Sequence, residues 1–332
     1  MGNNLLNLFI ENNKALENVK GSWGMYGFQM KGSALSYTMK NQRVDTERVN
    51  LALDIITNNT SIFSNFRGMN KLTTAITISF EENMENSFRE IRAIYDSLKE
   101  SFYNNSYLVI TALVIYNARE RVKPIEAIKN TRLAYDYMKH HHRFLTGQED
   151  ISSAAIIATT SNNLEKTFID IEKCYEYLKD RKISSSNNIQ GLSHMLSLIN
   201  KSCEDKCNSA IEMNSILKNK KVALKSYYLP MLGVVAFLGD NKEAIADSII
   251  EVDKVLKKEK GFGNFTLGAD FRNMISAALV SHEYIDNMDE NIKENITNNT
   301  NNIALTVAIA VQTAIIVSSA SAAAAASASS SS

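Results

Sequence analysis

The chain contains few of the residues that form turns and cross-links. Its 332 residues include only two prolines, 13 glycines and three cysteines. Architectures with many β-strands need a turn every few residues, so this scarcity favours long helices. An odd and small number of cysteines argues against a disulfide framework and suits a reducing compartment. The composition therefore predicts an all-α protein without structural disulfides.

Excess charge and a basic leader are also lacking. Lys and Arg total 36, and Asp and Glu total 36, so the formal charge is zero. No nucleic-acid partner is expected, because binding to phosphates relies on excess cations. Residues 1–13 do not combine a basic stretch with an apolar core, so no signal peptide is predicted. Without a predicted signal peptide, the cytoplasm is the expected location. A globular protein is expected, since 45% of the residues are hydrophobic.

An apolar residue near the predicted end of a long helix recurs about every forty residues. Successive intervals are 42, 40, 40, 39 and 39 residues, and tyrosines 95, 135 and 175 follow the same spacing. Periods of about 20 to 50 residues are typical of stacked supersecondary units. The sequence predicts stacked antiparallel helical hairpins, either an α-solenoid-like array or a closed helical array. The residues that mark the period are Ile56, Leu98, Met138, Leu178, Leu217 and Leu256.

Local signals agree with this period. Each unit is predicted to pair a short apolar helix, such as Ala154–Ala158, with a longer amphipathic one, such as Lys166–Lys179. Capping-box sequences precede three of the long helices, and proline is expected at the start of another. The predicted caps are Asn162, Ser202 and Asp240, and the proline is Pro124.

Three segments are predicted from these patterns. Residues 1–33 form an N-terminal cap, residues 34–294 form the helical-hairpin repeat domain, and residues 295–332 contain an Asn-rich linker, an apolar helix and an Ala/Ser tail. Ile303–Ala328 is long enough to span a bilayer, but polar residues dilute it and no cation flanks it. A helix packed on the last hairpin is preferred, with membrane association and a disordered tail as alternatives.

Cations cluster just after the predicted ends of the long helices. In the preferred interpretation they offset the negative end of each helix dipole, worth about 0.3–1 kcal/mol apiece. Alternatively, stacking aligns them into one basic edge that binds an acidic partner or an anionic surface. The candidate contacts on this edge are Lys179, Arg181, Lys218, Lys220, Lys221, Lys257 and Lys258, with Tyr227 and Tyr228 added if their rings are exposed.

The turn at residues 140–150 holds the candidate metal ligands His140, His142 and Asp150. Adjacent residues on a helix point about 100° apart, so consecutive histidines do not all face one ion. A structural turn is preferred, with Thr146 and Glu149 as the capping box of the next helix. No cofactor is predicted.

Two further local patterns are given structural interpretations. Cys203 and Cys207 are four residues apart on a predicted helix and suited to share an ion, but no further ligand is in view unless His194 folds close. Small core residues are the preferred interpretation of both thiols. The glycine-rich segment 260–268 matches no phosphate-binding motif, so Gly261 is expected to end the preceding helix in a left-handed conformation.

Three segments resemble a known bacterial family. Phe144–Asp150, Tyr228–Gly233 and Leu267–Arg272, together with the Ala/Ser tail, are similar to the domain-of-unknown-function family 4003, found mainly in Firmicutes. The resemblance extends over nearly the whole chain. It implies a bacterial cytoplasmic protein and supplies no activity, substrate or catalytic residue.

No catalytic motif such as G-x-S-x-G or H-E-x-x-H is present. The leading hypothesis is a non-enzymatic interaction, scaffold or regulatory protein that binds a protein partner, since helical arrays present extended surfaces. The first alternative is a metal-dependent protein or enzyme that uses the His140–Asp150 turn. The second is membrane association through Ile303–Ala328.

Overall fold

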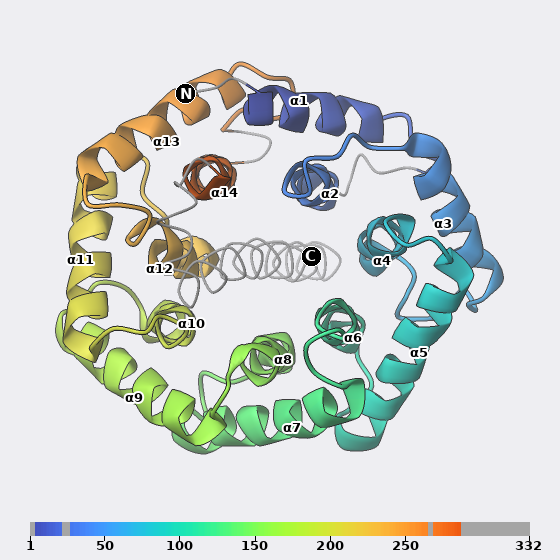
Figure 1. The fold of residues 1–332 in the computed structure, drawn as a ribbon, viewed down its shortest axis with the longest axis horizontal. Coiled ribbons are helices and arrows are strands. Elements are labelled where there is room, and N and C mark those ends of the chain that lie inside the picture. Colours follow the sequence, from blue (N-terminus) through green and yellow to red (C-terminus); the bar gives the residue numbers. More distant parts are fainter. Residues whose placement is uncertain (1–3, 22–26, 265–267, 287–332) are drawn as a thin grey trace, which may run out of the picture. The chain divides into compact units, whose positions relative to one another are not determined.

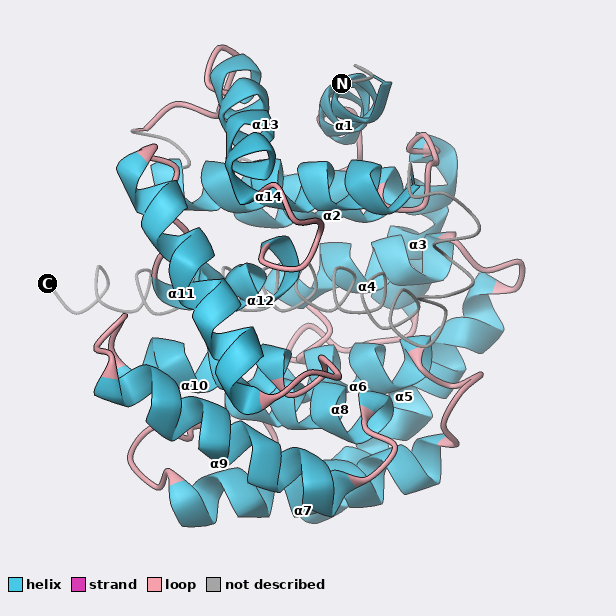
Figure 2. Cartoon of the chain, turned by 60° about the vertical axis from the view of Figure 1, so that its left-hand side comes forward, coloured by secondary structure: helices cyan, strands magenta, loops and turns pink. Residues whose placement is uncertain are grey.

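The computed structural model describes residues 4–21, 27–264 and 268–286 (Figure 1). Every regular element in these ranges is a helix, which confirms the all-α prediction (Figure 2). The chain separates into two compact units. The N-terminal unit comprises residues 8–164, and the C-terminal unit comprises residues 4–7 and the described residues after 164.

Amphipathic helices alternate with helices that are buried on most sides in the N-terminal unit. The amphipathic helices are α1 (Asn4–Leu16), α3 (Thr46–Asn58), α5 (Met84–Ser101) and α7 (Pro124–His141). The buried helices are α2 (Gly27–Thr38), α4 (Met69–Ser79), α6 (Tyr107–Asn117) and α8 (Asp150–Thr160).

This alternation produces two layers within the N-terminal unit. α3, α5 and α7 contact one another in order, as do α2, α4, α6 and α8. Across the layers, α3 contacts α4, α5 contacts α6, and α7 contacts α8. Figure 1 shows α4, α6 and α8 end-on while α3, α5 and α7 run across the view, so the two layers cross. α5 buries Phe88, Ile91, Tyr95 and Leu98 on one face, at the three- and four-residue spacing of a helix.

Two arginines forty residues apart join α5 and α7 each to the end of the amphipathic helix before it. Arg92 of α5 donates to the carbonyl of Asn59, the C-cap of α3, at 2.8 Å. Arg132 of α7 donates to the carbonyl of Ser101, the last residue of α5, at 3.0 Å. Helix C-termini leave carbonyl oxygens unpaired, so these contacts satisfy them and fix the register of neighbouring helices.

The C-terminal unit continues the alternation with less regular buried elements. Its amphipathic helices are α9 (Leu164–Asp180), α11 (Cys203–Asn219) and α13 (Lys242–Leu256). Its buried elements are α10 (Ser186–Leu196), the 3₁₀ helix η2 (Ser226–Met231), α12 (Leu232–Val235) and α14 (Ala269–Asp286). η2 contacts α10, α12 and α14, and α11 contacts α13.

All six residues that mark the forty-residue period are at most 2% exposed. Each lies in the last turn of one amphipathic helix, from Ile56 in α3 to Leu256 in α13. The predicted apolar period therefore coincides with core positions.

The predicted helix starts are only partly correct. Ser202 is the N-cap of α11, and Pro124 is the first residue of α7, as predicted. α13 is capped by Asn241 and not by Asp240, because the Asn241 side chain accepts the backbone amide three residues later at 3.0 Å. Gly261 has a positive φ of 82°, but α13 ends at Leu256, so this glycine does not terminate the helix.

Several predictions concern segments at the ends of the chain. The boundary predicted at residue 33 falls inside α2. Residues 295–332, with the predicted linker, the apolar helix Ile303–Ala328 and the Ala/Ser tail, lie outside the described residues. Within the described ranges, no helix combines the length and the apolar character that a bilayer crossing requires.

Truncation of a period-marking residue tests the packing of the layers. Leu98→Ala should lower the free energy of unfolding by about 2–5 kcal/mol, because the fully buried side chain leaves a cavity between α5 and its neighbours. Urea denaturation of the full chain measures the change. The matched control is Leu133→Ala in α7, where the side chain is 49% exposed and a loss below about 1 kcal/mol is expected. Equal losses for both variants would contradict the layer assignment.

Candidate functional site

A groove of about 770 Å³ opens in the N-terminal unit between the α5–α6 loop, α7 and the start of α8. Aromatic and cationic side chains dominate its lining. They are Phe102, Tyr103 and Tyr135, with Lys99, Arg132 and Lys139.

The two consecutive aromatics of the α5–α6 loop take opposite environments. Phe102 is buried and packs edge-on against Tyr135, with ring centroids 5.5 Å apart. Tyr103 is 86% exposed. The guanidinium of Arg132 lies 5.0 Å from the Phe102 ring and 5.6 Å from the Tyr135 ring. The groove thus has a rigid aromatic and guanidinium floor and a solvent-exposed tyrosine at its edge.

Cations outnumber carboxylates among the residues that line the groove. Glu100 is the one acidic residue among its lining residues, against three cations. Lys99 pairs with Asp96 at 2.6 Å, and Arg132 pairs with Asp136, both within α-helical turns at partly exposed positions. Exposed pairs of this kind contribute about 0–1 kcal/mol, so the cations remain able to exchange them for a partner's carboxylates.

Lys139 holds the far wall of the groove in place. Its ammonium donates to the carbonyl oxygens of Arg143 at 3.1 Å and Thr146 at 2.5 Å. Thr146 is not the N-cap of α8 that the sequence predicted, because its hydroxyl donates instead to the carbonyl of Met138 at 3.1 Å. The α7–α8 loop is therefore fixed by side-chain contacts to carbonyls of its own segment.

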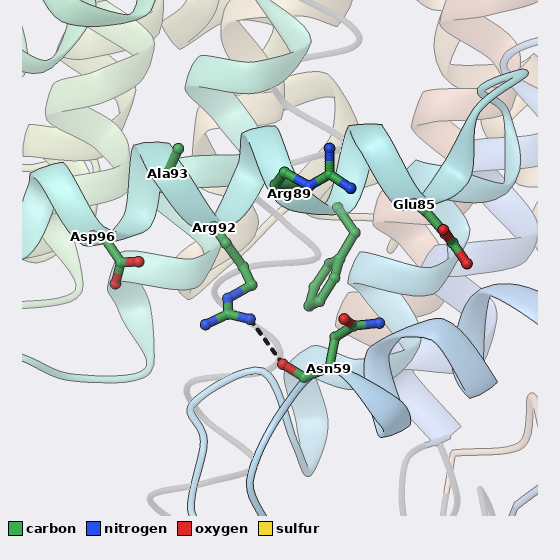
Figure 3. Close-up of a pocket in the computed structure, with 7 residues that line it drawn as sticks. Asn59, Glu85, Arg89, Arg92, Ala93 and Asp96 are labelled. Carbon is green, nitrogen blue, oxygen red and sulfur yellow. Dashed lines mark hydrogen bonds between the residues drawn. The ribbon is translucent and has the colours of Figure 1, made fainter.

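A smaller pocket of about 380 Å³ lies between the end of α3 and α5 (Figure 3). Arg92 reaches across it to the Asn59 carbonyl. Arg89 and Arg92 are matched in its lining by Glu85 and Asp96. This balance gives the smaller pocket no preference for a partner of either charge.

Three loops of the N-terminal unit each expose one aromatic ring. Phe63, Tyr103 and Phe144 are 91%, 86% and 96% exposed, in the α3–α4, α5–α6 and α7–α8 loops. They are 40 and 41 residues apart, so they occupy matching places in successive helix pairs. Spacing alone does not tell an exposed ring from a buried one, so the sequence pattern does not single out these three residues as exposed.

The predicted metal ligands of the His140–Asp150 turn lie on separate parts of the turn. His140 is in the last turn of α7, His142 is the C-cap, and Asp150 is the first residue of α8. Asp150 accepts the Gly147 backbone amide at 2.8 Å. Among the described residues, the His, Cys, Asp and Glu ligand atoms that converge in a group of three are those of cysteines 174, 203 and 207.

Burial changes the acidity of Asp150. Desolvation raises the pKa of this carboxyl to about 7, and the hydrogen bond from the Gly147 amide opposes the rise. Gly147, which donates to the Asp150 carboxyl, and Ile151, which follows Asp150 in the chain, both line the groove. The titrating carboxyl of Asp150 is therefore next to the groove.

The elevated pKa of Asp150 predicts a pH-dependent stability. The folded state binds this proton more tightly than the unfolded chain, so the stabilisation is present below about pH 4 and is lost as pH rises to about 7. Asp150→Asn keeps an acceptor for the Gly147 amide and does not titrate. Relative to the native chain, it should gain about 1–3 kcal/mol between pH 4.5 and 7.5.

Urea denaturation of both chains at the two pH values measures this difference. Asp136→Asn, at an exposed carboxylate of α7, is the matched control. An Asp150→Asn chain whose stability followed the same pH dependence as the native chain would exclude a raised pKa for Asp150.

The residues of the predicted basic edge lie in the C-terminal unit. Lys179 is in the last turn of α9 and Lys218 in the last turn of α11, while Lys220 and Lys257 are the C-caps of α11 and α13. The remaining three, Arg181, Lys221 and Lys258, follow the ends of the same helices.

Several of these cations have partners within the unit. Lys220 pairs with Glu243 at 3.0 Å and Asp247 at 2.5 Å. The Arg181 guanidinium lies 3.4 Å from the Tyr177 ring centroid. Lys179 pairs with Glu176 at 3.2 Å, an exposed pair within one helix like that of the groove residue Lys99 with Asp96.

Tyr228 differs from the exposed rings of the N-terminal unit. Tyr228 is buried, and its ring centroid lies 5.6 Å from that of Phe271. Desolvation raises its pKa. A contact role for Tyr228 requires an exposed ring, and this ring is buried. Tyr227 precedes it in η2.

The fold defines an all-helical array protein. The family described as "Protein of unknown function (DUF4003)" matches residues 13–314, and the chain belongs to this family. It is similar to the uncharacterised protein YeaA of Bacillus subtilis (strain 168), with 22% identity over 253 residues that cover 74% of this chain and 75% of YeaA. No solved structure matches the chain. The family membership that the resemblance of three short segments predicted is confirmed, and the description of this family assigns no activity.

Proposed function

We propose that this chain is a non-enzymatic, cytoplasmic interaction protein built from helical repeats of about forty residues. Its N-terminal unit binds an acidic segment of a partner protein in the groove between the α5–α6 loop and α7. The observation that carries this proposal is the grouping of three cations and one carboxylate around exposed and buried aromatic rings.

Charge and shape both favour an acidic peptide segment. Complementary charge steers association and suppresses wrong partners. Tyr103 supplies a large ring that loses little conformational freedom when covered. The groove volume lies in the range of about 300–1,000 Å³ that accommodates a small ligand or a few side chains, so a short segment fits it better than a folded domain.

The basic edge of the C-terminal unit supports contact with the same class of partner. Lys218 donates to the carbonyl of Ile183 at a long 3.5 Å. Its neighbour Lys221 and the lysines 257 and 258 stand at helix ends, where cations also offset the helix dipole. We propose that these residues attract acidic segments electrostatically within their own unit, whereas the specific contacts are those of the groove in the N-terminal unit.

Defined peptides test the groove directly. The probe is a fluorescent nonapeptide of Glu and Asp with one central Trp, and its counterpart has Lys at every acidic position. The full chain should bind the acidic peptide, with an affinity that falls as salt is raised. Lys99→Glu and Tyr103→Ser should each weaken binding about tenfold, which corresponds to about 1.4 kcal/mol.

The matched control is Phe63→Ser, which removes an equally exposed ring from a loop outside the groove and should leave the affinity unchanged. Equal binding of the basic peptide, or equal loss in Phe63→Ser and Tyr103→Ser, would contradict the proposal. A photo-reactive residue placed at position 103 extends the test to the host cell. The segment that it cross-links must be rich in Asp and Glu, and cross-linking to a neutral or basic segment would also contradict the proposal.

A further inference from the structure

All three cysteines of the chain meet at one place in the C-terminal unit. Cys203 and Cys207 are one turn apart on α11, and Cys174 faces them from α9. Their sulfur atoms all lie within 4.8 Å of one another. Cys174 and Cys207 are fully buried, whereas Cys203 is partly exposed at the first position of α11.

We propose that Cys174, Cys203 and Cys207 bind one Zn²⁺ ion as three thiolates. Zn–S bonds are about 2.3 Å long, which places the sulfurs of a tetrahedral site about 3.8 Å apart. The observed cluster reaches that spacing through side-chain shifts of about 1 Å or less. The partly exposed Cys203 gives the ion a route of entry and leaves a fourth position for water.

The charge around the cluster favours zinc over a monovalent soft ion. Three thiolates and Zn²⁺ carry a net charge of −1, whereas the same thiolates and Cu⁺ carry −2. Lys206, the neighbour of Cys207, is 1% exposed and pairs with Asp170, one turn before Cys174. This ion pair is neutral as a whole and does not offset the charge of the metal complex. The zinc complex, with a charge of −1, is therefore less costly to bury than the Cu⁺ complex, with a charge of −2.

Two of the three thiols, Cys174 and Cys203, hold their protons more tightly than an ordinary cysteine. Burial raises the pKa of Cys203 to about 11, and a hydrogen bond with Cys207 together with burial raises that of Cys174. Binding therefore follows Zn²⁺ + 3 RSH → Zn(SR)₃⁻ + 3 H⁺, with the protons passing to solvent. Oxidation proceeds through thiolates, so the same protonation disfavours a redox role in the metal-free chain.

Zinc binding to the reduced full-length protein tests this site. Competition with a chromophoric zinc chelator should show one ion per chain and all three thiols protected from a thiol reagent. Co²⁺ in place of Zn²⁺ should give thiolate-to-metal charge-transfer absorption. Cys207→Ser should weaken zinc binding at least about 100-fold. The matched control is Asn208→Ala, which removes only the α9–α11 contact with Tyr177 and should retain the ion.

Three outcomes would overturn the site. They are a reduced native chain that binds no stoichiometric zinc, a Cys207→Ser chain that binds as the native chain does, and zinc-free protein from cells with a disulfide between two of the cysteines. If Cys207→Ser fails to fold by circular dichroism, Cys203→Ser takes its place, because that thiol is partly exposed at a helix start. A folded Cys203→Ser chain that retains native affinity would equally end the proposal.

Discussion

The structure depends on burial of apolar helix faces between two layers. In α6 every residue from Leu108 to Tyr116 is buried, so this helix is stable only when α5 and α8 cover it. Burial of a large apolar side chain contributes about 1.5–3 kcal/mol, and the six period-marking residues make that contribution at the ends of α3, α5, α7, α9, α11 and α13. The core thus fixes where these six amphipathic helices stop and where the next loop must turn.

Both candidate sites arise from the geometry of these helix ends. The groove forms where α5 stops at Ser101, and Arg132 reaches that last carbonyl from α7. The thiol cluster forms where α11 starts at Cys203, one helix turn before Cys207. Helix ends leave polar groups unpaired and place side chains at the rim of a layer. In this helical array, the candidate binding groups therefore lie at the ends of the helices, while the middles of the helices pack in the core.

The sequence predicts what depends on local spacing and misses what depends on register between helices. The all-α class and the six core positions follow from periodicity, and Ser202 follows from its capping box. The approach of Cys174 to Cys203 crosses 29 residues and depends on how α9 lies against α11, so no local pattern marks it. Phe102 and Tyr103 are adjacent aromatics, and only the end of α5 decides which ring is buried. Thr146 satisfied the capping pattern, yet the Met138 carbonyl competed for its hydroxyl.

Zero net charge is compatible with a charge-selective groove. Fields of exposed charges are screened within about 8 Å at physiological ionic strength, so a ligand responds to nearby groups and not to the total for the chain. Lys99, Arg132 and Lys139 outnumber Glu100 among the residues that line the groove, and the carboxylates that pair with Lys99 and Arg132, Asp96 and Asp136, are not part of that lining. The smaller pocket beside α3 has equal numbers of arginines and carboxylates and so lacks this bias. Local distribution, and not the balance of 36 cations against 36 anions, decides which surface attracts an acidic partner.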